Sequence, residues 1–109
     1  MTDALVVLIT APKEEDAAAM ANALVEGGLA ACVNIIRQVR SIYRWQGKIE
    51  DDQEVLMIAK TRKECFADLV NKVKELHTYS VPEIIALPVM DGFEGYLGWL
   101  KEETGGKEN

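Results

Sequence analysis

Three side chains in this sequence could carry metal or nucleophile chemistry: its only histidine and its two cysteines. His77 could bind a transition metal or titrate near neutral pH, or it could simply end a helix, where the dipole stabilises positive charge. Cys32 could offer a soft thiolate to Cu(I), Zn(II) or Hg(II), or fill a core position as a small hydrophobe. Cys65 lies at the start of a predicted helix, where it could be a reactive thiol or a helix-surface or half-buried residue. Their joint chemistry depends on the elements that position them.

Common catalytic motifs do not occur in this sequence. It contains no Gly-x-x-x-x-Gly-Lys loop, no Gly-x-Ser-x-Gly elbow and no paired histidines for a zinc hydrolase. A Cys–His dyad would require one of the cysteines to approach His77 in the folded chain. A cysteine-dependent hydrolase or transferase is therefore the least favoured function, and we expect a protein that is not an enzyme.

Length and composition indicate one soluble domain. The 109 residues can bury a core, and the formal charge of −6 opposes general binding to a nucleic-acid backbone. The arginines of Arg37–Arg44 cluster, but the acidic block Glu50–Glu54 lies close to them. The sequence shows no signal peptide, no run long enough for a membrane helix and no Cys-x-x-Cys pair. We expect a cytoplasmic protein without nucleic-acid or membrane partners.

Hydrophobic patterns predict four strands and three helices. Continuous apolar runs predict buried strands at Leu5–Ile9 and Val55–Ala59. Period-two alternation predicts a strand over Ala31–Tyr43, and turn-like flanks predict a fourth at Glu83–Leu87. Apolar residues at helical spacing predict helices between Pro12 and Gly27, between Thr61 and His77, and over Phe93–Glu102.

Three connecting segments have their own signals. The polar piece Ile49–Glu54 and the turn Gln46–Lys48 predict a long two-stranded arm between the second and third strands. The segment Thr61–Glu64 fits a capping box, in which the Thr hydroxyl and the Glu carboxylate satisfy free N–H groups of the second helix. The end of the sequence, about Gly105–Asn109, is predicted to be a frayed, disordered tail.

The predicted order of elements is β-α-β-β-α-β followed by a helix. This order defines an α+β, ferredoxin-like sandwich, with two helices on one face of a mostly antiparallel sheet. In this topology the first and third strands lie side by side in the middle. Composition alone marks the same two strands as buried on both faces, so two independent observations agree. We expect a single domain over residues 1–109.

A specific combination of segments runs through the sequence: Thr10–Pro12, Leu29–Ile35, Ser41–Glu50, Lys60–Thr61 and Leu76–Pro88. They contain an Ala-Ala-Cys-Val-Asn block, a Tyr-x-Trp-x-Gly-Lys arm and a Pro-Glu-Ile strand start. From about Leu5 to Trp99, the pattern resembles the CutA family of divalent-cation tolerance proteins. The resemblance implies a ferredoxin-like fold, a tight homotrimer, a likeness to PII-type signal proteins, and an association with tolerance to copper and other divalent metals.

The resemblance is incomplete at one metal site. Some copper-binding members of the family have a cysteine near the end of the first strand and a His-His pair after the second helix. Here the matching positions hold Ile9 and Leu76-His77, so only the second histidine remains.

Two functional hypotheses fit the residues and the resemblance. The first is a non-enzymatic homotrimer linked to copper and divalent-metal tolerance, which binds Cu or another divalent ion weakly through His77 with Cys32 or Glu54. The second is a PII-like signalling or adaptor trimer that binds a small anionic ligand or an unidentified protein partner. Aromatic residues on the arm favour burial between copies of the chain. The candidates for an inter-subunit pocket or interface are Tyr43, Trp45, Lys60, Tyr79 and Glu83.

Overall fold

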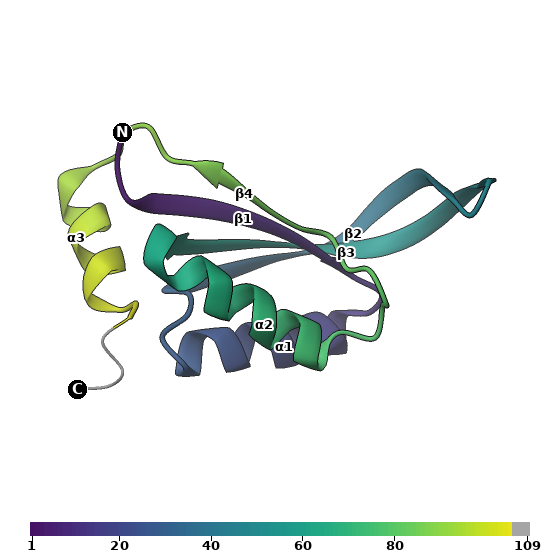
Figure 1. Ribbon diagram of the computed structural model, residues 1–109, viewed down its shortest axis with the longest axis horizontal. Helices are drawn as coiled ribbons and strands as arrows, with labels where there is room; N and C mark the ends of the chain where they lie inside the picture. The colour runs from purple at the N-terminus through teal and green to yellow at the C-terminus, as the bar shows by residue number, and fades with distance from the viewer. Residues whose placement is uncertain (106–109) are drawn as a thin grey trace.

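The computed structural model describes residues 1–105, which form one four-stranded antiparallel sheet with three helices (Figure 1). In chain order the elements are β1 (Ala4–Ala11), α1 (Glu14–Glu26), β2 (Cys32–Trp45), β3 (Lys48–Arg62), a 3-10 turn (Lys63–Cys65), α2 (Phe66–Leu76), β4 (Ile84–Pro88) and α3 (Glu94–Glu102). None of the helices within this range has the length and apolar character needed to cross a membrane.

The sheet order β2-β3-β1-β4 confirms the predicted ferredoxin-like architecture. β1 pairs with β3 from Ala4↔Arg62 to Ala11↔Val55, and its other edge pairs with β4. The two central strands are the two with continuous apolar runs, because a strand with neighbours on both edges and packing on its faces has little contact with water.

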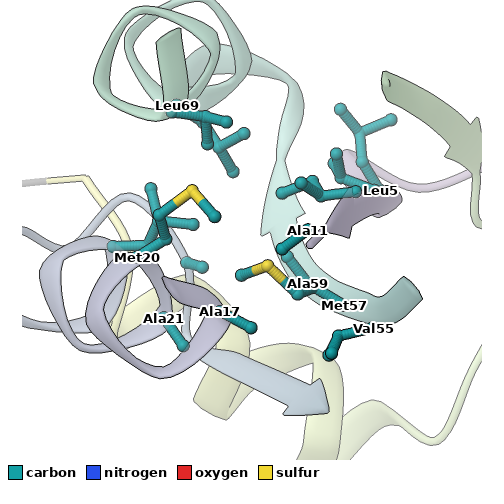
Figure 2. Close-up of a cluster of buried hydrophobic side chains, with 14 residues drawn as sticks. Leu5, Ala11, Ala17, Met20, Ala21, Val55, Met57, Ala59 and Leu69 are labelled. Carbon is teal, nitrogen blue, oxygen red and sulfur yellow. The ribbon is translucent and has the colours of Figure 1, made fainter. Parts of the chain in front are cut away.

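One face of the sheet carries the main core. Alternate residues of β1 and β3 point to the same side, where α1 and α2 cover them (Figure 2). Met20 of α1, Leu69 of α2 and Met57 of β3 meet in this layer and are almost fully buried. Burial of each such side chain contributes roughly 1.5–3 kcal/mol, so this layer holds the helices to the sheet.

The opposite face of the sheet is also apolar but less covered. Leu100 of α3 packs against Ala4 and Ala31 at one end of it. Farther along, Ile85 and Leu87 of β4 are about half exposed. A single chain therefore leaves apolar strand surface open to solvent.

The predicted arm is present and projects from the sheet as a twisted two-stranded ribbon (Figure 1). Its ladder runs from Val39↔Glu54 to Trp45↔Lys48, after an irregularity between Ile36 and Val39. Gln46 and Gly47 close the hairpin with positive φ angles of 50° and 82°. Two positive φ angles in a two-residue loop give the primed turn that matches the right-handed twist of the strands.

The predicted capping box at Thr61–Glu64 is wrong. Thr61 belongs to β3, opposite Leu5 of β1, and its hydroxyl donates to the Leu29 carbonyl at 2.6 Å. Glu64 pairs instead with the Arg62 guanidinium at 2.9 Å. The ladder with β1 keeps Thr61 extended, so its hydroxyl cannot cap the helix that follows.

The chain after α3 is attached to the body of the protein. Arg62 donates to the Thr104 hydroxyl at 2.8 Å and to its carbonyl at 2.7 Å. The Gly105 N–H donates to the Gly28 carbonyl at 2.8 Å. Gly105, at the start of the predicted tail, is thus held by a hydrogen bond, and the rest of that tail, residues 106–109, lies outside the described residues.

Candidate functional site

His77 lies directly after α2 and connects the following loop to the end of β1. Its Nε2 lies 2.7 Å from the Thr10 carbonyl oxygen, and its Nδ1 accepts the Tyr79 backbone N–H at 3.0 Å. Since a carbonyl can only accept, these partners fix the tautomer with hydrogen on Nε2. Both ring nitrogens are engaged, so a metal ion would have to displace a backbone hydrogen bond to reach this ring.

Tyr79 carries this connection onward to the base of the arm. Its hydroxyl donates to Glu54 Oε2 at 2.7 Å, and its ring lies 4.6 Å from that of His77 between centroids. Burial, followed by the hydrogen bond and charge of Glu54, raises the pKa of Tyr79 well above its ordinary value. The phenol therefore stays a hydrogen-bond donor to the carboxylate over the physiological pH range.

One side of the arm is acidic. Glu50, Asp52 and Glu54 alternate along β3 and so project from the same side, where their partners on β2 are Tyr43, Ser41 and Val39. The Tyr43 hydroxyl donates to Asp52 Oδ2 at 2.7 Å. This hydrogen bond, then desolvation and the three carboxylates, raises the pKa of Tyr43 to about 12.

One arginine of the arm is directed to its other side, whereas Lys48, the partner of Trp45, follows Glu50 at the tip in the same register as the carboxylates. Arg40 binds Asp51 through two hydrogen bonds of 2.9 and 2.7 Å, a bidentate pair that lowers the pKa of Asp51. Arg40 and Asp51 occupy the alternate strand positions, so they point to the side opposite Glu50, Asp52 and Glu54. The acidic side of the arm therefore keeps its negative charge instead of having it neutralised by this arginine.

A cavity of about 580 Å³ lies between the arm and the loop that follows α2. Its lining comes from the arm (Ser41, Ile42, Tyr43, Trp45, Glu54), from the loop (Tyr79, Ser80, Val81, Glu83) and from Thr10 of β1. We call this cavity the arm pocket. It brings together five of the predicted site residues: Tyr43, Trp45, Glu54, Tyr79 and Glu83.

Cys32 and Lys60 lie elsewhere. They face each other across β2 and β3, and Lys60 Nζ is hydrogen-bonded to Asn34 Oδ1. Lys60 is six residues from Glu54 along β3, which corresponds to roughly 20 Å in a strand. One chain therefore does not bring Cys32 to His77 or Glu54.

The structure also separates the groups needed for a metal centre or a cysteine nucleophile. Within residues 1–105, no three His, Cys, Asp or Glu side chains gather in an arrangement that could hold a metal ion. Cys65 is 3% exposed, with its thiol 4.0 Å from the Gly28 carbonyl. It lies at the opposite end of α2 from His77, roughly 18 Å away by helical rise. A His77–Cys32 copper pair and a Cys65–His77 dyad do not form within one chain.

Several pocket residues were missed by sequence reasoning. Ser80 and Val81 are next to predicted residues in the sequence, but no motif or periodicity marks them as pocket residues. Ser41 could have been found, because it falls at period two with Tyr43 on the predicted arm.

The fold and the pocket define a class: small ferredoxin-like proteins in which the β2–β3 hairpin extends as an arm and forms a pocket with the loop before the last strand. Within that class, the chain belongs to the family of CutA1 divalent ion tolerance proteins, whose family model matches residues 5–103.

Individual relatives agree with this assignment. The chain is 56% identical over 100 residues to the divalent-cation tolerance protein CutA of Thermus thermophilus, covering 92% of this chain and 97% of that protein. It is 49% identical over 96 residues to human protein CutA, but it spans only 54% of that protein's length, with 88% of this chain covered.

Solved structures show the same fold. The structure of the divalent cation tolerance protein Cut A1 from Thermus thermophilus matches with a TM-score of 0.92 and 55% identity, covering 94% of this chain and 99% of that one. The structure of the "periplasmic divalent cation tolerance protein CutA" from Archaeoglobus fulgidus matches with a TM-score of 0.89 and 43% identity, covering 92% and 97%.

Proposed function

We propose that this protein is a non-enzymatic homotrimer that acts in tolerance to divalent metal ions, copper among them, and binds such ions weakly. Membership of the CutA1 family supports the role in tolerance. The observation that carries the rest is the acidic arm pocket, where residues predicted from the family pattern converge around Glu54. We also propose that it works in the cytoplasm, which its two free cysteines favour.

Assembly is supported by the apolar surface that one chain leaves open. Ile42, Trp45 and Ile49 are exposed on the arm, and Ile85 and Leu87 are exposed on the sheet. The sheet also ends in two edge strands, β2 and β4, whose free backbone groups can pair with another chain. Three copies around one axis would cover both kinds of surface.

We assign the metal contact to Glu54 and not to the pair of His77 and Cys32. Glu54 is a carboxylate with its side chain in the pocket, whereas the lone pair of His77 is used by the Tyr79 N–H. Because one chain supplies few ligands, a weak site completed by a neighbouring subunit fits better than a closed site. Cys32 would take part only through groups of a second copy.

Calorimetric titration with Cu(II) and Zn(II) tests this assignment. We expect Glu54→Gln to weaken binding at least threefold, while Glu26→Gln, which removes one negative charge from the exposed end of α1, leaves binding unchanged. Cys32→Ser should bind the ions as wild type does. His77→Ala should change ion binding mainly by releasing the Tyr79 backbone N–H and so disturbing the contact of Tyr79 with Glu54. If wild type binds neither ion, or Glu54→Gln binds as tightly as wild type, the assignment is wrong.

A PII-like trimer for a small anionic ligand is the less supported alternative. Among residues 1–105, the pocket lining contains two glutamates and neither lysine nor arginine. Lys60, the cation expected to serve such a ligand, lies near the far end of β3. A thermal-shift screen with nucleotides would favour this alternative if nucleotides stabilised the protein and metal ions did not. If neither nucleotides nor metal ions stabilised the protein, an adaptor role would require a partner protein as the ligand.

A further inference from the structure

We propose that the arm pocket binds a linear organic ammonium cation, of the diamine or polyamine kind, between the carboxylates of Glu54 and Glu83 and the rings of Tyr43, Trp45 and Tyr79. Such binding goes beyond metal tolerance, and it depends neither on a metal ion nor on the assignment of one to Glu54. It would give the pocket a ligand of its own.

The charge of the pocket selects a cation. The lining residues contributed by one chain include Glu54 from the arm and Glu83 from the loop, and no basic side chain among the described residues. Outside the lining, Asp52 accepts a hydrogen bond from Tyr43, and Glu50 follows on the same side of β3, while Lys48 at the tip lies beyond the lining residues. A concave surface with one sign of charge concentrates ligands of the opposite sign.

Glu54 has an oxygen available for a ligand. The residue is 8% exposed, and its Oε2 is taken by the Tyr79 hydroxyl. The other oxygen, Oε1, forms no hydrogen bond. Because no buried side-chain polar atom within residues 1–105 lacks a partner, Oε1 must be accessible to solvent, and the cavity provides that access. A mostly buried carboxylate gains a charge-assisted hydrogen bond when an ammonium N–H reaches it.

The aromatic walls favour an organic cation over a bare metal ion. Indole and phenol rings attract ammonium groups through their faces, with Trp the strongest. By contrast, a hard divalent ion prefers six or more oxygen ligands, and the described residues contain no cluster able to supply them. The volume of about 580 Å³ lies in the range of small-molecule sites.

The shape of the arm indicates a linear ligand. Alternate residues on a strand are separated by about 6.6 Å, so Glu50, Asp52 and Glu54 set carboxylates at regular intervals. Two amino groups joined by four methylene groups span a similar length. A diamine can thus place one ammonium at Glu54 and the other farther along the arm, with its methylene chain against the rings.

Calorimetry at low ionic strength with 1,4-diaminobutane tests this directly, since salt screens such attraction. We expect saturable binding, and none of 1,4-butanediol, a neutral analogue of equal length. Glu54→Gln should weaken diamine binding about tenfold, because one charged hydrogen bond is lost. Glu26→Gln, with the same change in net charge at a distant exposed site, should bind as wild type does.

A second readout places the ligand on the arm. The sequence has two tryptophans, so in Trp99→Phe the indole fluorescence reports on Trp45 alone, and the diamine should change it saturably. Trp45→Leu should weaken binding severalfold. If Trp45→Leu disturbs assembly on a sizing column, Tyr43→Leu removes a neighbouring ring of the same pocket instead.

The outcomes separate this ligand from the metal. Equal binding of diamine and diol, unchanged affinity in Glu54→Gln, or no diamine binding to wild type overturns the inference. Zn(II) titration of the same samples tests the metal assignment separately. Binding of diamine but not of Zn(II) would refute the metal assignment alone. Binding of Zn(II) without diamine would refute only the organic ligand.

Discussion

Tyr79 links three parts of the molecule through one side chain and one backbone N–H. Its N–H fixes His77, its ring packs beside the imidazole, and its hydroxyl binds Glu54. The histidine that first suggested metal chemistry thus lies behind Tyr79, a lining residue of the arm pocket, and contacts it without lining the pocket itself. Its structural role, through the Thr10 carbonyl, is to hold the loop after α2 against β1.

The tyrosines should titrate unusually late. The pKa values of all three, Tyr43, Tyr79 and Tyr96, are raised above 10.0, so the folded state favours the neutral phenols. The stability gained from this is complete below about pH 10 and is lost as the pH rises through the raised values. In Glu54→Gln, the pKa of Tyr79 should fall because the neighbouring charge is gone.

Tyrosinate absorbance during an alkaline titration measures this effect. We expect the latest of the three transitions to move to lower pH in Glu54→Gln and to be absent in Tyr79→Phe. Identical titration curves for wild type and Glu54→Gln would show that Glu54 does not control Tyr79.

Removal of the His77 ring should destabilise the fold. His77→Ala leaves the Thr10 carbonyl and the Tyr79 N–H without their partners, which costs about 1–3 kcal/mol when such groups are buried. Urea unfolding monitored by circular dichroism measures the change. Lys74→Ala, on the exposed side of the same helix, is the control and should change stability by less than about 0.5 kcal/mol.

At the scale of elements, the arm depends on the geometry of its turn. Gly47 has a φ of +82°, and a Cβ there would meet no atom within 4 Å. Gly47→Ala should therefore cost about 1–2 kcal/mol through backbone strain alone, since the left-handed region disfavours residues with a Cβ. Gly98 of α3 also has open space around it but sits inside a helix.

The same substitution at the two glycines should therefore have opposite effects. Gly98→Ala should stabilise the protein by about 0.5–1 kcal/mol, because alanine is the better helix former. Thermal unfolding followed by circular dichroism compares the two variants. Destabilisation of equal size in both would contradict the role of φ at the arm turn.

Local patterns in the sequence sufficed for most elements but not for their contacts. The apolar runs of β1 and β3 and the alternation in β2 depend on near neighbours, so they could be predicted. The prediction of a capping box failed because Thr61 is held in the ladder with β1, a strand far away in the sequence. The site itself depends on contacts such as His77 with Thr10, 67 residues apart, which no periodicity reveals. The separation of Cys32 from Glu54 likewise emerges only from the register of the ladder.

At the scale of the whole molecule, the arm should control assembly. Trp45 is 41% exposed in one chain. The two-stranded arm is too thin to bury its own apolar residues. Trp45→Ala removes a large apolar contact from the proposed trimer interface, so we expect dissociation at low micromolar concentration. Size-exclusion chromatography with light scattering measures the mass. A trimer of unchanged mass at that concentration would show that the arm tip is not important for assembly.

The alternation of side chains along β3 has a consequence for the length of the arm. Because every second residue points the same way, deleting Gln53 would turn Glu50 and Asp52 away and bring Asp51 round to the acidic side of the arm. Removing two consecutive residues from each strand, that is, two neighbouring facing pairs, would preserve the orientation of all that remains. Parity, more than size, therefore constrains this hairpin, and functional variants should shorten or lengthen it by even steps.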